Sequence, residues 1–316
     1  MQSSLGTKST PIIQPVQRRR PRYGRIFTIV LFLLPAAAVY IYFVILPIGQ
    51  SVFYSLFRWN GLGPLENFIG LDNYTKALGD KVFVGALSHN LLIAVLSIVI
   101  QLPLSLVLAL LVARHLPGRS VFRMIFFLPY VLSDVTTGVI WSFVYKPDNG
   151  LLNTALRNLN LGDGQAWLGT PNLALYAVFV VMCWKYFGFH LILYVAGLQQ
   201  IPADLEEAAK MDGASNFQVL RHITVPLLGG TIRISVFLSI LGALQYFDLI
   251  WVMTLGGPVN ASETMATYMI KNGFQRFQLG YGSAVGVILF LVCFVFSLAY
   301  QRMVLHRDLA GSGALT

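Results

Sequence analysis

The chain has 316 residues, of which 56% are hydrophobic and only 11% are charged. Because soluble domains carry about 25% charged residues, this composition excludes a soluble globular protein and indicates a membrane protein without a large soluble module. The formal net charge of +9 does not indicate a nucleic-acid partner, since the basic residues gather at the ends of the apolar segments.

Six apolar segments predict an all-α membrane protein with six transmembrane helices, embedded in a lipid bilayer. Each segment is nearly free of charge and covers the ~20 residues that cross a bilayer as a helix, whereas barrel strands would be about half as long. The segments are residues 26–48, 88–113, 121–145, 173–198, 230–253 and 282–304. Prolines inside or near them are expected to kink the helices: Pro35, Pro47, Pro103 and Pro129.

The distribution of basic residues predicts that both termini are cytoplasmic. With the N-terminus inside, fourteen Lys and Arg residues face the cytoplasm and seven face the outside, while Lys185 lies within the membrane. Residues 1–25 then form a basic cytoplasmic tail, 26–305 a membrane domain, and 306–316 a cytoplasmic C-terminal tail. The polar segment between the fourth and fifth spans is cytoplasmic as well.

That polar segment, residues 204–226, is predicted to form two short helices. Asp204 and Glu207 have the spacing of a capping box, which predicts a helix beginning near residue 205. Gly213 is the expected left-handed terminator of this helix, because a residue with a Cβ atom would be strained there.

A second helix is expected to begin at Ser215 or Asn216, both of which are favoured N-cap residues. From the residues alone, two interpretations of the whole segment remain open. It is either an ordinary amphipathic loop packed under the membrane domain, with Glu207 as a capping acid, or a surface that a partner protein holds.

The fourth and fifth spans carry polar residues that are unusual inside a membrane. Lys185 lies within the fourth span, and an intramembrane lysine is costly unless it is paired or hydrated, so it is a candidate cavity residue. Gln245, Tyr246 and Asp248 lie in the fifth span. Lys185 and Asp248 could form a structural ion pair between the two spans, or the coupling pair of an ion-driven secondary transporter.

Several kinds of chemistry are absent from the sequence. No Gly-rich run followed by Lys and Ser or Thr appears, so this chain is not expected to bind ATP through a P-loop. The five histidines lack the spacing of metal ligands, and no nucleophile stands near a base. Cys183 and Cys293 lie in apolar spans and are expected to be small buried hydrophobes. We therefore predict a protein without a catalytic site, metal or cofactor of its own.

The polar segment resembles the EAA loop of permease subunits of ATP-binding-cassette (ABC) importers. The resemblance consists of Glu207-Ala208-Ala209, then Gly213, Ile223 and Pro226 at the spacing of that motif, with Val225 where the family usually has Leu. The segments 68–74 (FIGLDNY) and 254–258 (TLGGP) look like carbohydrate importers of the maltose and glycerol-phosphate type. The second of these is similar to the F-type rather than the G-type subunit.

This resemblance implies a type I ABC importer permease fold in a bacterial cytoplasmic membrane. The EAA loop would be the coupling helix that docks on a separate ATPase, with Glu207 facing a cationic group and Gly213 setting a bend. The implied partners are a G-type permease, two ATPase subunits that bind ATP and Mg²⁺, and an extracytoplasmic solute-binding protein. The residues implied in coupling are Glu207, Ala208, Ala209, Asp212, Gly213, Ile223 and Pro226.

The resemblance also implies that a sugar, a disaccharide or oligosaccharide, crosses the membrane by alternating access. Positions that match the sugar-lining residues of the maltose F-type subunit, with their polar neighbours, are Met182, Lys185, Tyr186, Phe189, Ser239, Gly242, Ala243, Gln245, Tyr246 and Asp248. Most of them differ in identity from that subunit. They combine aromatic faces with a few hydrogen-bonding groups, as a cavity for a polar ligand requires.

Overall fold

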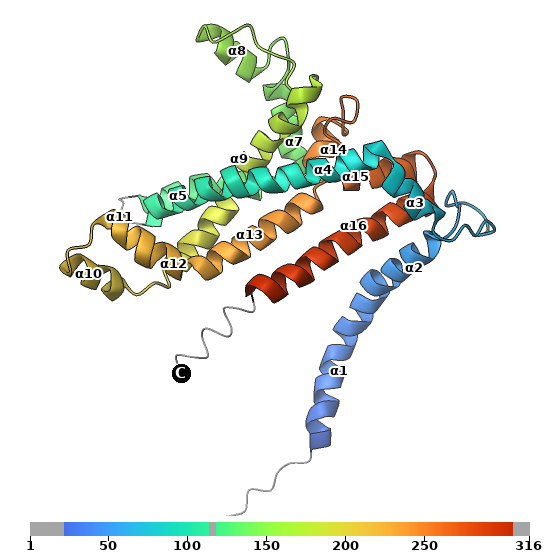
Figure 1. Cartoon of the computed structure of the whole chain (residues 1–316), viewed down its shortest axis with the longest axis horizontal. Coiled ribbons are helices and arrows are strands. Elements are labelled where there is room, and N and C mark those ends of the chain that lie inside the picture. Colours follow the sequence, from blue (N-terminus) through green and yellow to red (C-terminus); the bar gives the residue numbers. More distant parts are fainter. Residues whose placement is uncertain (1–21, 114–117, 306–316) are drawn as a thin grey trace, which may run out of the picture. The chain divides into compact units, whose positions relative to one another are not determined.

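The computed structural model describes residues 22–113 and 118–305 (Figure 1). Most of the predicted N-terminal tail and the whole predicted tail 306–316 lie outside these residues. Within them the chain is helical, with a single isolated β-bridge between Phe57 and Phe68. The contacts within the chain divide it into two units, residues 1–49 and 50–316.

The first unit contains one long apolar helical stretch. It consists of α1 (Arg22–Tyr40), the π-helical segment η1 (Ile41–Ile45) and the start of α2 (Leu46–Tyr54). Residues 27–54 are long and apolar enough to cross a membrane.

The second unit contains the other spans and the loops between them. Its first half comprises α3 (Asp72–Gly79), α4 (Lys81–Leu96), η2 (Ser97–Gln101), α5 (Leu102–Ala113), α6 (Arg119–Val131), α7 (Asp134–Val144), α8 (Leu151–Asn158) and α9 (Pro171–Leu198). Its second half comprises α10 (Ala203–Met211), α11 (Asn216–Val219), η3 (Leu220–Thr224), α12 (Val225–Leu227), α13 (Gly229–Leu244), α14 (Asp248–Met253), α15 (Met265–Ile270), η4 (Lys271–Gln275), α16 (Leu279–Tyr300) and η5 (Gln301–Leu305).

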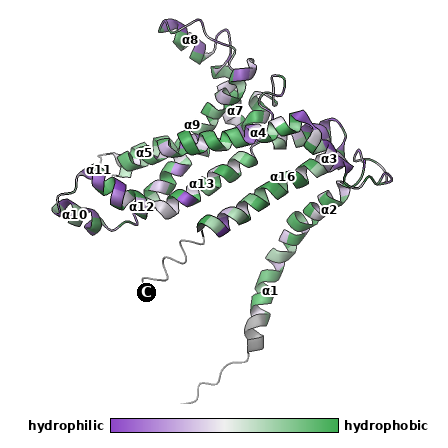
Figure 2. Cartoon of the chain, viewed as in Figure 1, coloured by the Kyte–Doolittle hydropathy of each residue, from purple (hydrophilic) through white to green (hydrophobic). Residues whose placement is uncertain are grey.

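Five helical stretches in the described residues are long and apolar enough to cross a membrane, and a sixth span is formed if one bent pair of helices counts as one. These stretches are the green helices of Figure 2, whereas the segments α10 to α12 carry much of the polar colour. The prediction of an all-α membrane fold is confirmed. Residues 121–145, predicted as one helix with a kink at Pro129, instead form two helices, α6 and α7, which meet at a bend of 95°.

The bend between α6 and α7 has a local cause. Leu132 and Ser133 both adopt extended backbone angles, and the Ser133 hydroxyl accepts a hydrogen bond from the Thr136 amide at 3.1 Å. This N-cap starts a new helix, and Asp134 places an acidic group in its first turn, where the helix dipole favours negative charge. Ser133, Asp134 and Thr136 were visible in the sequence, but they were included in one predicted span with the apolar residues on both sides.

The fifth span is interrupted as well. Helix α13 ends at Leu244, and α14 begins at Asp248, so Gln245, Tyr246 and Phe247 form a non-helical link within the span. Irregular backbone at membrane depth is tolerated only where protein buries it or where it lines a cavity. We therefore expect each of the two breaks either to be buried by protein or to line a cavity.

Two of the expected proline kinks, at Pro47 and Pro103, take the form of π-helical segments, and a third such segment precedes Pro226. The segments η1, η2 and η3 each end two residues before a proline, namely Pro47, Pro103 and Pro226. A proline cannot donate an amide hydrogen, and its ring crowds the carbonyl four residues earlier, which here is the middle of each π segment. Widening the turn to the π spacing relieves that contact.

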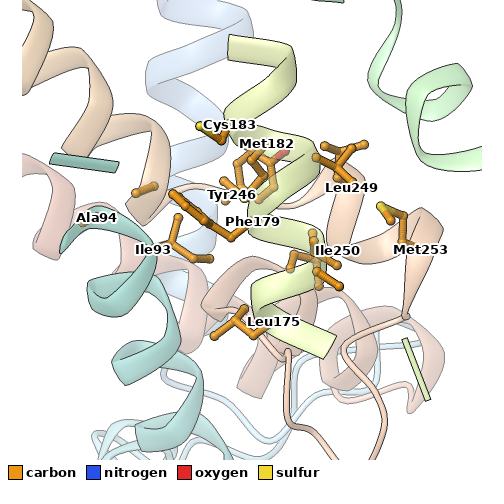
Figure 3. Close-up of a cluster of buried hydrophobic side chains, with 14 of the residues drawn as sticks. Ile93, Ala94, Leu175, Phe179, Met182, Cys183, Tyr246, Leu249, Ile250 and Met253 are labelled. Carbon is orange, nitrogen blue, oxygen red and sulfur yellow. The ribbon is translucent and has the colours of Figure 1, made fainter. Parts of the chain in front are cut away.

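Helices α4, α9, α13 and α14 share a buried cluster of apolar side chains. Phe179, Met182 and Cys183 of α9 meet Ile93 of α4 and Ile250 of α14 (Figure 3). Since lipid tails are as apolar as these side chains, close van der Waals contact and not the hydrophobic effect holds such helices together. The cluster fixes the position of α9 against the interrupted fifth span.

One close approach also fixes α6 on α9. A Cβ atom at Gly188 would overlap with the backbone carbonyl oxygen of Phe126 and would lie 3.1 Å from the Cα atom of Phe127. Small residues at helix interfaces allow this kind of contact in membranes. The first half of the bent span therefore packs directly on the fourth span.

Helix α4 begins at Lys81, seven residues before the predicted span, because Asp80 caps it. The Asp80 carboxylate accepts hydrogen bonds from the amides of Val82 (2.7 Å) and Phe83 (3.3 Å) and from the hydroxyl of Tyr268 (2.8 Å). Burial raises the pKa of Asp80, but these hydrogen bonds outweigh it, and the pKa lies below its ordinary value. The cap ties the start of α4 to α15.

Candidate functional site

The polar segment between the fourth and fifth spans forms α10, α11, η3 and α12 at one end of the second unit (Figure 1). Helix α10 begins at Ala203, and no side chain caps its first turn. The predicted capping box between Asp204 and Glu207 is therefore wrong. Pro202 occupies the N-cap position, so Asp204 lies inside the first helical turn, where it acts through the helix dipole.

The end of α10 and the start of α11 follow the prediction. Gly213 has a φ angle of +88°, in the left-handed region that favours glycine. Ser215, and not Asn216, is the N-cap of α11: its hydroxyl accepts from the Gln218 amide (3.3 Å), and the Gln218 side chain accepts from the Ser215 amide (2.7 Å). This reciprocal pair is a capping box.

One contact within the polar segment was not predicted. The hydroxyl of buried Thr224 donates a hydrogen bond of 2.8 Å to the carboxylate of Glu206, which ties α10 to η3. Glu207, its neighbour, is exposed and has no hydrogen bond or ion pair among the described residues. The two adjacent carboxylates thus differ: Glu206 serves the fold of the loop, and Glu207 is free for a partner.

The other predicted coupling residues lie between α10 and α12 of the same polar segment. Ala208, Asp212 and Pro226 are exposed, whereas Ala209 and Ile223 are half-buried. Most of the predicted coupling residues are therefore accessible to a partner protein, while Ala209 and Ile223 also pack within the segment.

A second site lies at the two helix breaks, where the structure forms a cavity of about 380 Å³. Nine of the ten predicted substrate-pathway residues line it, and Lys185 is the exception. The lining residues are Ser97, Gln101, Tyr130, Met182, Tyr186, Phe189, His190, Leu238, Ser239, Gly242, Ala243, Gln245, Tyr246, Phe247 and Asp248. Positions chosen from two separate spans thus meet in one space.

Aromatic rings form much of the wall of this cavity. Tyr130 of α6 stacks on Phe189 of α9 with ring centroids 5.1 Å apart, and its ring lies edge-on to that of Tyr186 at 6.0 Å. Tyr246, from the break of the fifth span, meets Tyr186 edge-on at 6.3 Å. Flat apolar faces from three spans therefore surround the space.

The polar groups of the cavity are few. The Ser239 and Tyr246 hydroxyls are buried and have no hydrogen-bond partner among the described residues. His190 is bonded to the Ser235 hydroxyl at 2.7 Å. Asp248 is the one carboxylate in the lining, and no Lys or Arg belongs to it.

Lys185 lies behind the cavity wall. Its side chain is 2% exposed, and its ammonium group donates to the carbonyl oxygen of Leu132 and lies 3.8 Å from the Asp134 carboxylate. Tyr186 donates to the same carboxylate at 2.8 Å. The predicted ion pair between Lys185 and Asp248 is therefore wrong: Lys185 pairs across the break between α6 and α7, which the sequence did not reveal.

Six residues of the lining were missed in the sequence. Ser97 and Gln101 stand four residues apart in an apolar helical stretch, a spacing that places both on one helix face, so they could have been found. Tyr130 and Phe247 owe their position to the two breaks. His190 belongs to the polar patch of the fourth span in the sequence and could have been found there, whereas Leu238 gave no signal beyond its place in an apolar span.

The class of protein follows from comparison with known families. The family described as "binding-protein-dependent transport system inner membrane component" matches residues 101–307, which include the polar segment and every lining residue of the cavity except Ser97. The chain belongs to this family, and it is thus a multi-pass membrane permease rather than an enzyme.

Individual relatives agree with this assignment. A probable ABC transporter permease protein, YurN of Bacillus subtilis, is 38% identical over 86% of this chain and 94% of its own length. The diacetylchitobiose uptake system permease protein NgcF of Streptomyces coelicolor is 34% identical over 89% of this chain and 83% of its own.

A solved structure shares the fold. A chain of a bacterial ABC transporter involved in the import of the acidic polysaccharide alginate superimposes with a TM-score of 0.79, covers 89% of this chain and 96% of its own, and is 23% identical. The type I permease fold that the EAA resemblance implied is thereby confirmed. An ion-coupled secondary transporter is not favoured, because the family is binding-protein-dependent and Lys185 does not pair with Asp248.

Proposed function

We propose that this chain is the F-type permease subunit of an ABC importer for an uncharged sugar, a disaccharide or oligosaccharide. The observation that carries the proposal is the cavity at the two helix breaks. Aromatic faces suit the C–H surfaces of sugar rings, and the free hydroxyls of Ser239 and Tyr246 suit sugar hydroxyls. A relative that shares 34% of its residues is named for diacetylchitobiose uptake.

The charge of the cavity supports an uncharged substrate. Asp248 contributes a negative charge to the lining, and no cation compensates it there. A uronic acid or sulfonate would meet a like charge in a space of low dielectric, where repulsion is stronger than in water. A neutral sugar can accept hydrogen bonds from the hydroxyls and donate to Asp248.

The polar segment supports coupling to a separate ATPase. Glu207 is exposed and has no partner among the described residues. The hydrogen bond between Glu206 and Thr224 links α10 to η3, so the two segments are expected to move together. A force applied to α10 would therefore reach α12 and, through it, α13, which lines the cavity. An exposed ion pair alone contributes about 1 kcal/mol or less, so the packed segment must transmit the motion, with Glu207 setting its orientation.

In the proposed assembly this chain pairs with a G-type permease subunit, two ATPase subunits and an extracytoplasmic binding protein. Both termini and residues 204–226 face the cytoplasm, as the distribution of Lys and Arg favours. ATP binding draws the coupling segments together and opens the cavity outward, where the binding protein delivers the sugar. Hydrolysis restores the inward-facing state, so ligand and nucleotide bias two conformations.

Replacing Tyr246 by phenylalanine tests the role of the cavity. We expect the variant to fold normally and to lose about fivefold in uptake, because a hydrogen bond to a sugar is worth about 1 kcal/mol. Uptake is measured in proteoliposomes of the assembled transporter with its binding protein, using labelled diacetylchitobiose, maltose and alginate oligosaccharides. Uptake of a neutral sugar, and not of alginate fragments, is the expected pattern.

The matched control is Tyr145→Phe, which removes a hydroxyl that donates to the Ala177 carbonyl (3.1 Å) outside the cavity. This control should leave the concentration dependence of uptake unchanged. Equal losses in both variants, or preferred uptake of the alginate fragments, would contradict the proposal.

A further inference from the structure

The break in the fifth span leaves backbone carbonyls without helical partners. Helix α13 ends at Leu244: the Gly242 carbonyl accepts from the Gln245 amide, but the Ala243 and Leu244 carbonyls accept from no backbone amide among the described residues. In a membrane such groups cannot turn to water, and each must find a partner within the protein. What satisfies them also determines where the link of residues 245–247 runs.

One side chain, Asn90 of α4, satisfies two of these carbonyls. Its amide group donates to the carbonyl oxygens of Ala243 (2.6 Å) and Leu244 (3.2 Å). Its own oxygen accepts a hydrogen bond of 2.9 Å from the amide of Met265. Asn90 is fully buried, so a single amide joins α4, the end of α13 and the start of α15.

A second side chain completes the arrangement. The hydroxyl of Thr264, the N-cap of α15, donates to the carbonyl of Tyr246 at 2.9 Å. Thr264 is itself held in a capping box with Thr267 and is fully buried. The carbonyls of Ala243 and Leu244 at the helix end and of Tyr246 in the link are thus held by two buried side chains.

We infer that Asn90 and Thr264 are positioning residues that hold the break of the fifth span in the shape that forms the cavity. Neither residue lines the cavity. They act on the link whose side chains do: Gln245 and Tyr246 follow directly after the carbonyls that Asn90 holds. The role parallels that of Lys185, which donates to the carbonyl of Leu132 at the other break.

Packing alone does not explain an asparagine at position 90 in an apolar span. A buried asparagine in an apolar span is costly unless its amide is fully used, and here both ends of the amide are bonded. Asn153 gives a natural comparison, because its amide likewise donates to two carbonyls, those of Pro147 and Gln165, at 2.9 Å each. Asn153 lies in α8, on a different part of the second unit, and it does not line the cavity.

The test compares Asn90→Asp with Asn153→Asp in the assembled transporter in lipid nanodiscs. Each change keeps the acceptor oxygen but removes the donor that bridges two carbonyls. Two readouts need no sugar: amide hydrogen exchange over residues 241–253, and the rate at which N-ethylmaleimide labels a Gln245→Cys reporter. The reporter is placed in a chain whose buried cysteines are removed (Cys183→Ala and Cys293→Ala).

We expect Asn90→Asp to accelerate exchange over residues 241–253 by at least tenfold and labelling by at least fivefold. Asn153→Asp should leave both within twofold while accelerating exchange over residues 147–167. If Asn90→Asp prevents assembly, Thr264→Val serves instead, with at least threefold faster exchange over the same residues. Changes below twofold for the Asn90 or substitute Thr264 variant, or equal changes for Asn153→Asp, overturn the inference.

The inference rests on the proposed function only in calling the cavity a sugar pathway. A transporter that fails to take up sugar but shows the expected exchange and labelling would contradict the proposed function alone. One that takes up sugar but shows no difference between the asparagine variants would contradict this inference alone.

Discussion

Replacing Glu207 by lysine is expected to reduce ATP-driven uptake by at least tenfold while leaving the permease folded and in the membrane. Glu207 is exposed on α10 and has no partner among the described residues, so the fold does not depend on its charge. Reversing the charge sets a cation against the cationic group expected on the ATPase. Like-charge contacts of this kind cost several kcal/mol at an interface.

Two further variants separate coupling from folding. Glu207→Gln removes the charge without reversing it and should lower uptake only about fivefold or less, because an exposed ion pair is worth about 1 kcal/mol or less. Glu206→Gln keeps an oxygen that can accept from Thr224 and should behave like the unaltered chain.

The measurement is ATP hydrolysis and sugar uptake by the same proteoliposomes. For Glu207→Lys we expect hydrolysis that no longer responds to the sugar-loaded binding protein. Normal coupled uptake in this variant would show that α10 is not the docking surface.

Replacing Lys185 by methionine is expected to destabilise the protein by about 1–3 kcal/mol, because it leaves the partly exposed Asp134 carboxylate without its cationic partner. The Leu132 carbonyl at the break also loses its donor. Helices α6 and α7 would then lose a fixed geometry at their bend, and Tyr186, which donates to Asp134, would lose its orientation toward the cavity.

Paired substitutions identify the partner of Lys185. Lys185→Met combined with Asp134→Asn should recover much of the lost stability, because no unpaired charge remains in the protein interior. The combination with Asp248→Asn should recover none. Thermal unfolding of the purified complex in detergent gives the comparison, and recovery with Asp248→Asn instead would support the pairing first expected from the sequence.

The sequence was informative where a local rule governs the structure. Gly213 takes the left-handed angle that ends α10, and Ser215 caps α11 with Gln218, because both depend on neighbours within a few residues. The apolar segments were found for the same reason, since the length of a span depends on the bilayer and not on other spans.

The sequence failed where distant residues decide the structure. The break at Leu132 and Ser133 lies between two apolar stretches, and the Leu132 carbonyl there accepts from Lys185, 53 residues away. Asn90 contacts Ala243, 153 residues away, and nothing in its own span suggested that role. The EAA resemblance singled out Glu207, but the contact of Glu206 with Thr224, 18 residues away, could not be predicted from the sequence.

The cavity was predicted in part for a specific reason. Met182, Tyr186 and Phe189 of the fourth span have helical spacing, and all three line the cavity, as the family resemblance implied. Gln245 and Tyr246 also line it, but through a non-helical link that periodicity cannot describe. Lys185 was assigned to the substrate pathway, but it does not line the cavity, and its ammonium group pairs with the Asp134 carboxylate instead.

The central claim is that a separate ATPase drives this permease by holding residues 204–226. The most direct measurement purifies the complex through an affinity tag on this chain and follows sugar uptake in proteoliposomes energised either by internal ATP or by an ion gradient. We predict that an ATPase subunit copurifies, that uptake requires ATP, and that uptake persists when ionophores dissipate every ion gradient. Purification without an ATPase, or uptake that an ion gradient drives in the absence of ATP, would contradict the account.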